Sequence, residues 1–241
     1  MIFRKSSSAI RALAASGFLV TLAACNSSSE VGTLPPPPPP PPPPVTYSYE
    51  VTVHNLTHGQ ALSPIAVMLH GEESFYEVGE PASVPVEIMA EEGAIEELLA
   101  LDIVLASANG TDAILPGASE TFTVSIEDND SANLAILTML AATNDAFTGL
   151  QGLSLAGMEV GDVIYRLTNV YDSGTEANTE TPATLITSPG GEGYNPERDD
   201  VDFVSMHPGI VSNQDGLPDS DLTGDFKFDN PAAKVTVTRT E

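Results

Sequence analysis

The pattern of hydrophobic and polar positions predicts short β-strands over most of residues 45–241. Residues 46–56 alternate between apolar and polar side chains, with Tyr47, Tyr49, Val51 and Val53 on one face. This period of two is typical of a strand with one buried face. Further strands are predicted at 120–126, 133–140, 162–167 and 233–239. Turn signals such as Pro116-Gly117 separate them.

Residues 85–105 follow a different pattern, in which apolar side chains stand among Glu residues. This spacing predicts one or two short amphipathic helices, broken at Gly93. The acidic run 127–130 is predicted to form a tight hairpin loop. Many short strands with little helix favour an all-β fold, an antiparallel β-sandwich with one or two short helices inserted.

The N-terminus has the features of an export signal. Arg4, Lys5 and Arg11 precede a short apolar stretch, which ends in Leu22-Ala23-Ala24-Cys25. A positive start, an apolar core and a small-residue end are typical of a secretory signal, and the last four residues resemble a bacterial lipobox. We therefore expect residues 1–25 to be a lipoprotein signal peptide and Cys25 to carry the lipid. The alternative is an ordinary signal peptide with an incidental cysteine.

A tether is predicted between this anchor and the domain. Residues 26–34 are small and polar, and Pro35 to Pro44 are ten consecutive prolines. Such a run favours polyproline II, a semi-rigid spacer of roughly 30 Å at about 3.1 Å per residue. Residues 26–44 are interpreted as a disordered and polyproline tether. Docking of a proline-binding module is the alternative role of the run.

The chain is strongly acidic, with 34 Asp and Glu against 8 Lys and Arg and a formal charge of −26. Such a surface repels phosphate backbones, which argues against nucleic acid as a partner. It is compatible with divalent cations and with a saline habitat. Cys25 is the only cysteine, so no disulfide is available to the domain.

Several segments, in order along the chain, resemble the spondin domain, the N-terminal domain of F-spondin and mindin. They are residues 49–60, which run into Leu62-Ser63-Pro64, then 143–150, 171–176, 190–194 and 230–237. The resemblance covers nearly all of residues 46–240. It implies a β-sandwich that holds a divalent cation at one end.

The resemblance also implies the metal ligands, which fall on Asp145, Asp172 and Glu176. Calcium takes six to eight oxygen ligands, usually with several carboxylates. Asp145 and Asp172 each follow a predicted strand, and Ser173-Gly174-Thr175 could turn Glu176 back toward Asp172. Glu176 replaces the family's Asp, and Ala146 replaces its Trp. The alternative is that these are solvated loop acids.

Catalytic motifs are absent from the sequence. There is no His-Glu-x-x-His zinc motif and no Gly-x-Ser-x-Gly elbow, and the four histidines are expected to be structural or exposed. We therefore expect a non-enzymatic, calcium-binding domain for adhesion or ligand binding, held to the outer membrane at its periplasmic or surface face. Its ligand would be a protein or a glycan. The alternative is a periplasmic or surface hydrolase, or an accessory subunit of one.

Overall fold

The computed structural model describes residues 37–241, which include the end of the tether and the whole predicted domain. The signal peptide, Cys25 and residues 26–36 lie outside the described residues. Residues 37–42 belong to one unit and 43–241 form a second, compact unit. Residues 37–44 are exposed and carry neither helix nor strand.

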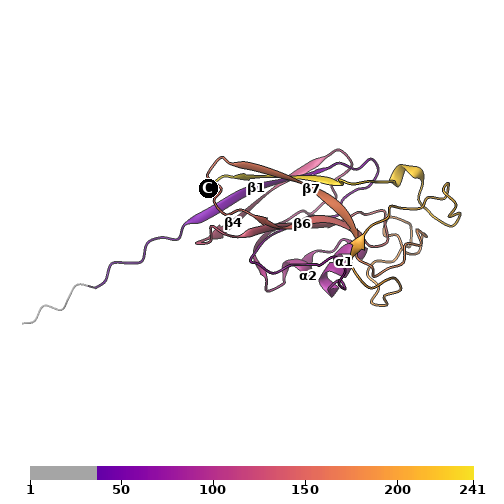
Figure 1. The fold of residues 1–241 in the computed structure, drawn as a ribbon, viewed down its shortest axis with the longest axis horizontal. Helices are drawn as coiled ribbons and strands as arrows, with labels where there is room; N and C mark the ends of the chain where they lie inside the picture. Colours follow the sequence, from indigo (N-terminus) through magenta and orange to yellow (C-terminus); the bar gives the residue numbers. More distant parts are fainter. Residues whose placement is uncertain (1–36) are drawn as a thin grey trace, which may run out of the picture. The chain divides into compact units, whose positions relative to one another are not determined.

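Antiparallel strands make up most of the compact unit, and two short helices and a 3-10 turn accompany them (Figure 1). The strands are β1 (Thr46–Asn55), β2 (Ala66–His70), β3 (Val104–Asn109), β4 (Ser119–Glu127), β5 (Asn133–Met139), β6 (Ala146–Ser154), β7 (Val163–Asp172), β8 (Ser205–Met206) and β9 (Ala233–Arg239). The helices are α1 (Val84–Glu92) and α2 (Glu96–Leu99), and the turn is η1 (Gly224–Phe226). The expected all-β class with short helices is confirmed.

The sheet has two halves that pack face to face, and strand β7 belongs to both. Its order is β3-β2-β5-β6-β7-β9-β1-β4, with β8 beside β7. Residues 163–168 of β7 pair with β9, whereas 169–172 pair with β6. A sandwich usually has two separate sheets, but here one continuous sheet turns back on itself through β7.

The main core fills the space between the two halves. Tyr49, Val51 and Val53 of β1 are almost fully buried there, as their alternation predicted. They face Leu134 and Ile136 of β5. Sandwiching both apolar faces removes them from water, at about 25 cal/mol per Å² of apolar surface.

A second core lies between the two helices and the outer face of the half that contains β2, β5 and β6. Met89 of α1 and Leu98 of α2 pack with Met68, Leu137 and Phe147 from the sheet. Strands β2 and β5 are therefore buried on both faces. Burial on both sides explains their nearly continuous apolar sequences.

Helix α1 ends where the sequence predicted. Gly93 adopts φ 73°, and its N–H donates to the Met89 carbonyl. Glycine accepts this left-handed conformation without a Cβ penalty, which makes it the usual residue after a helix. Among residues 37–241, no helix is long and apolar enough to cross a membrane.

The prediction of a hairpin at residues 127–130 was wrong. Strand β4 pairs with β1, and β5 pairs with β2 and β6, so these residues connect the two halves of the sheet. Asp128 adopts φ 52°, and its Oδ1 accepts a hydrogen bond from the Val45 N–H at 2.8 Å. The alternation of the flanking strands does not reveal which strand pairs with which.

Candidate metal centre

A polar pole forms where β6 begins and β7 ends. The ladder between these strands places Ala146 opposite Asp172, and the ladder between β7 and β8 places Asp172 opposite Ser205. Asp145 immediately precedes β6, and His207 immediately follows β8. Strand register therefore brings Asp145, Asp172 and His207 together from three distant parts of the sequence.

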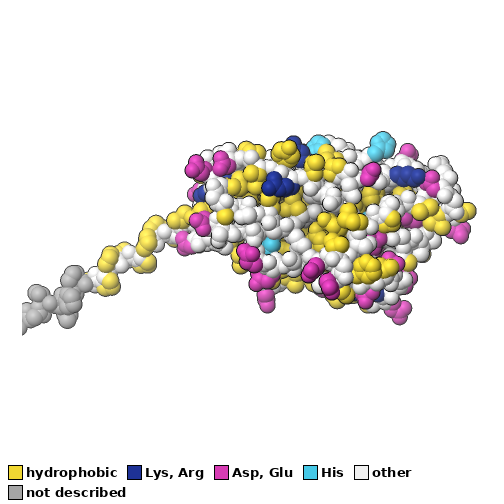
Figure 2. All heavy atoms as spheres, viewed as in Figure 1, with side chains coloured by type: hydrophobic (Ala, Val, Ile, Leu, Met, Phe, Trp, Pro, Cys, Tyr) yellow, Lys and Arg dark blue, Asp and Glu magenta, His cyan; other side chains and the backbone are white. Residues whose placement is uncertain are grey.

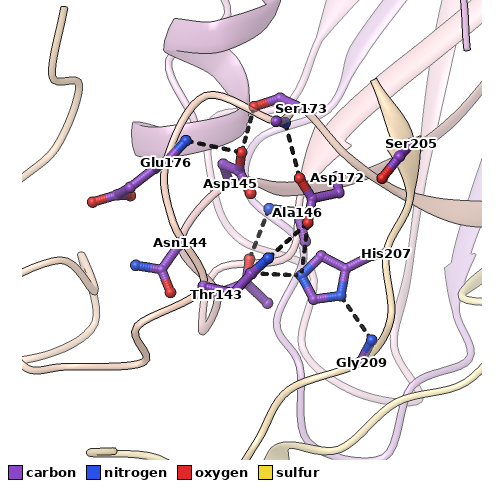
Figure 3. A network of polar contacts seen from close by, with 12 residues as sticks. Thr143, Asn144, Asp145, Ala146, Asp172, Ser173, Glu176, Ser205, His207 and Gly209 are labelled. Carbon is purple, nitrogen blue, oxygen red and sulfur yellow. Dashed lines mark hydrogen bonds and ion pairs between the residues drawn. The ribbon is translucent and has the colours of Figure 1, made fainter. Parts of the chain in front are cut away.

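These three side chains converge in a buried cluster (Figure 3). One ligand atom from each of Asp145, Asp172 and His207 lies within 4.8 Å of the others. Asp145 is fully buried and Asp172 is 2% exposed. Two ionised carboxylates no more than 4.8 Å apart repel each other by at least about 3 kcal/mol at an effective dielectric constant of about 20. A cation bound between the two carboxylates would offset this repulsion, because both carboxylates attract it.

Asp145 is held by one of its two oxygens. Its Oδ2 accepts hydrogen bonds from the Ser173 hydroxyl at 2.8 Å, the Thr175 N–H at 2.9 Å and the Glu176 N–H at 3.2 Å. Its Oδ1 is buried and has no hydrogen-bond partner within residues 37–241. An unpaired buried carboxylate oxygen is costly, so Oδ1 is the atom that most needs a cation.

Asp172 is held by its own turn and by a neighbouring amide. Its Oδ1 accepts from the Gly174 N–H at 2.9 Å, and its Oδ2 accepts from the Asn178 side-chain amide at 2.8 Å. Asn178 Oδ1 in turn lies 3.1 Å from His207 Nε2. Asn178 thus connects the carboxylate to the imidazole.

The hydrogen bonds of His207 decide which ring nitrogen carries the proton. The Gly209 N–H donates to Nδ1 at 2.9 Å, so Nδ1 is an acceptor. The proton is therefore on Nε2, which donates it to Asn178 Oδ1. Burial lowers the pKa of His207 to about 4, which leaves the ring neutral at pH 7. In this tautomer, the nitrogen that faces Asp172 has no lone pair to offer a metal.

Burial and mutual repulsion make the carboxylates at this pole hard to ionise without a cation. Burial, and then the charge of Asp172, raises the pKa of Asp145 to about 7. Burial also raises the pKa of Asp172. Burial raises the pKa of Glu176 to about 8, with further contributions from Glu91 and Asp145. The pKa of Glu180 is raised to about 7, mainly by burial.

Further acids from other elements surround the pair. Glu91 of α1 is 1% exposed and accepts a hydrogen bond from the Thr175 hydroxyl at 2.7 Å. Glu180 Oε2 is buried without a hydrogen-bond partner within the described chain. Arg198 forms ion pairs with Glu87 and Asp202, at 2.6 Å each, rather than with Asp145 or Asp172. The negative charge of the pair is therefore not neutralised by this arginine.

Of the three predicted ligands, two lie in the cluster and one does not. Asp145 and Asp172 are brought together, as expected. Glu176 gives its backbone N–H to Asp145, and its carboxylate points away from the pair (Figure 3). His207 and Asn178 were not predicted as part of the site. The strand before His207, β8, has only two residues, and Asn178 lies in a loop, so no alternating pattern marks either position.

The other histidines lie elsewhere. His70 is buried; its Nδ1 lies 3.0 Å from the Glu73 carbonyl, and its Nε2 accepts from the Gly152 N–H at 3.2 Å. His54 on β1 is half-buried and His58 is exposed. These three positions agree with the structural or exposed roles expected from the sequence.

No family model matches the chain, and no curated protein matches it. The interpretation of the site therefore depends on its own geometry.

Proposed function

We propose that the chain is a non-catalytic, calcium-binding domain of the spondin type that serves adhesion or ligand binding at the bacterial cell envelope. In this proposal Asp145 and Asp172 bind the cation, Cys25 carries the lipid anchor in the outer membrane, and the prolines separate the two. The ligand is a protein or a glycan at the periplasmic or outer surface.

One observation carries the metal assignment. Asp145 and Asp172 are buried side by side, and Asp145 Oδ1 has no partner within residues 37–241. Folding two carboxylates into one buried place is unfavourable unless a positive charge compensates them. The backbone N–H groups that hold Asp145 Oδ2 and Asp172 Oδ1 fix the carboxylates in position before any ion binds.

The chemistry of the donors favours calcium over zinc. Carboxylate and amide oxygens are hard donors, and Ca²⁺ accepts six to eight of them with water completing the shell. Structural zinc sites instead use cysteine and histidine. Cys25 is the only cysteine and is the proposed lipid acceptor, and the His207 nitrogen facing the pair is protonated. Glu176 supplies its backbone to the site, so it is not among the ligands we propose.

The position of the surface hollows favours binding over hydrolysis. Two grooves of about 520 and 530 Å³ lie along β6 and β7, and neither has Asp145 or Asp172 in its lining. An enzyme's perturbed acids are expected to line its substrate pocket. Asp145 and Asp172 lie instead in the buried interior of the pole.

Calorimetric titration of the purified, chelator-treated protein with Ca²⁺ tests this proposal. We expect binding for the wild type and at least a tenfold weaker affinity for Asp145→Asn and Asp172→Asn, a change of about 1.4 kcal/mol or more. Asp130→Asn, an exposed acid between β4 and β5, is the matched control. The absence of binding at millimolar Ca²⁺, or equal binding by all variants, would sink the assignment.

A further inference from the structure

Strands β6 and β7 separate after a short shared ladder. They pair from Ala146 to Gly149 and from Asn169 to Asp172. Beyond these pairs, residues 150–154 of β6 stay with β5, and residues 163–168 of β7 turn to β9. The continuous sheet is therefore open between these two segments.

The open side of β7 presents backbone groups in the spacing of a strand edge. The Ala232 N–H donates to the Thr168 carbonyl and the Arg239 N–H to the Asp162 carbonyl, so even-numbered residues from 162 to 168 direct their carbonyls toward β9. In an antiparallel ladder the alternate residues point the other way. Val163, Tyr165 and Leu167 thus direct their N–H and C=O groups into the opening, where the Tyr165 carbonyl accepts a hydrogen bond from the Arg166 guanidinium at 2.8 Å.

The same three residues expose large apolar side chains. Val163 is 60% exposed, Tyr165 59% and Leu167 54%, all on one face of the strand. An exposed, apolar strand edge is a template for pairing with another chain, which soluble proteins normally avoid. A groove of about 420 Å³ continues the edge, with Leu150, Leu153 and Arg166 in its lining.

Two basic side chains lie at this edge, although the chain carries a net charge of −26. Residues 37–241 contain five Lys and Arg, of which Arg166 lies on β7 and Lys234 on β9, whereas Arg239 of β9 lies over the Tyr47 ring of β1. Lys234 Nζ lies 5.0 Å from the centre of the Tyr165 ring. Figure 2 shows Lys and Arg beside hydrophobic side chains over the region of β1 and β7. Glu77 lines the separate groove of about 520 Å³.

We propose that the open edge of β7 binds an extended segment of a partner protein, which adds to the sheet as a strand. Strand addition uses main-chain hydrogen bonds for affinity and alternate side chains for specificity. On the outer face the partner's side chains would lie beside Val163, Tyr165 and Leu167. On the other face they would approach Arg166. The partner segment therefore alternates apolar residues with Asp or Glu.

The probe for this proposal is a fluorescent eight-residue peptide of alternating Val and Asp, followed by fluorescence anisotropy with the full chain. We expect saturable binding. N-methylation of every Val, or of every Asp, removes the N–H groups along one edge of the peptide. One of these two peptides is expected to bind at least tenfold more weakly than the parent, because its β7-facing N–H groups are lost. Since the change is in the peptide, folding of the protein is unaffected.

Charge reversal provides the second arm. Arg166→Glu is expected to weaken the Val/Asp peptide at least tenfold and to admit a Val/Lys peptide, which the wild type rejects. Lys227→Glu is the control, because Lys227 pairs with Asp215 outside the β7 and β9 edge. A control variant that loses as much affinity would overturn the role of Arg166.

Three further results would overturn the proposal. The first is no binding of the Val/Asp peptide at millimolar concentration, or equal binding of both methylated peptides. The second is a dimer of the chain alone in sedimentation experiments that Leu167→Asp dissociates, which would assign the edge to a second copy. The third is Arg166-dependent binding to phosphatidylglycerol vesicles without peptide binding, which would assign it to a lipid surface.

Discussion

At the scale of single residues, the metal pole is a set of acids placed where ionisation is unfavourable. Asp145 accepts three hydrogen bonds at one oxygen and none within the described chain at the other. The hydrogen bonds favour its charged form, but burial and the neighbouring Asp172 outweigh them and raise its pKa to about 7. His207 has the opposite tendency, because burial lowers its pKa.

This balance predicts how the stability of the calcium-free protein depends on pH. The pKa of Asp145 is raised from 3.8 to about 7, so the folded state holds more protons than the unfolded state between these values. Its contribution to the free energy of unfolding therefore falls as pH rises through this window. When the pH is raised from 5 to 8, the free energy of unfolding of Asp145→Asn relative to that of the wild type should therefore increase by on the order of 2 kcal/mol.

Urea unfolding in chelator at both pH values measures this difference. Comparing variant with wild type is essential, because His207 loses its stabilising neutral form as pH falls from 6.5 toward 4. Asp130→Asn controls for the loss of one surface charge. A variant whose advantage is the same at pH 5 and pH 8 would contradict the burial of an ionisable Asp145. Ca²⁺ should reduce or reverse the advantage, because the wild type binds it more tightly than the variant and is therefore stabilised more.

At the scale of elements, alternation in the sequence predicted the strands that have one buried face. Residues 46–56, 120–126 and 233–239 correspond closely to β1, β4 and β9. The continuous apolar run 133–140 corresponds to β5, which is buried on both faces. Strand β7 continues to Asp172, five residues beyond the predicted 162–167, because its second part joins a different half of the sheet. Alternation gives no information about this change of partner.

The elements that the sequence did not predict have physical reasons in common. Strand β2 is short and buried on both faces, so it lacks alternation. Strand β3 begins at Val104, within the last two residues of the segment 85–105 that was interpreted as helix, and its residues 106–109 were not predicted as strand. Strand β6 contains Gly149 and Gly152, which weaken the strand pattern. Asp145, one of the two proposed metal ligands, is therefore positioned by β6, a strand that the alternation of the sequence does not reveal.

Gly149 shows why a weak strand former stands in β6. A Cβ at this position would lie 2.2 Å from the Ile136 carbonyl oxygen of β5. Position 149 requires glycine because the backbones of β5 and β6 approach each other closely there, and this approach is a tertiary contact. Local propensity cannot anticipate such a contact.

The turn that follows β7 gives a test at this scale. Gly174 has φ +73°, and a Cβ there would lie 2.3 Å from the Phe203 carbonyl oxygen. Gly174→Ala should therefore destabilise the protein by more than the roughly 1–2 kcal/mol of the left-handed conformation alone. It should also weaken Ca²⁺ binding, because the Gly174 N–H holds Asp172.

Gly157→Ala separates the cost of the left-handed conformation from the cost of the close contact with Phe203. Gly157 has φ +74°, but a Cβ there would have no neighbour within 4 Å. Thermal unfolding and Ca²⁺ titration of both variants give the comparison. Equal destabilisation by the two substitutions would show that the contact with Phe203 has no influence on the turn.

At the scale of the whole molecule, the metal pole and the start of the domain lie at opposite ends. In Figure 1, β1 begins near the C-terminus at one end, and α1 and the loops of residues 173–232 gather at the other. The spondin resemblance stays a prediction, because it rests on short segments of sequence. The all-β fold and the meeting of Asp145 with Asp172 are properties of the structure itself.

The proposed lipid anchor predicts a modification at one atom. Expression in bacteria with an alkyne-labelled fatty acid should label the wild type and bring it to the membrane fraction. Cys25→Ser should lose both the label and the membrane association, because Cys25 is the only thiol in the chain. A wild type that is exported and cleaved without a label would instead indicate an ordinary signal peptide.

Strand β1 is paired on both sides, in nine residue pairs with β4 and seven with β9. Any mechanical load that arrives through Val45 enters the domain along this strand. A pull directed along β1 strains both ladders at once, so many hydrogen bonds must shear together instead of opening one after another. A pull at Val45 would thus load the fold in the direction in which a paired strand resists extraction best.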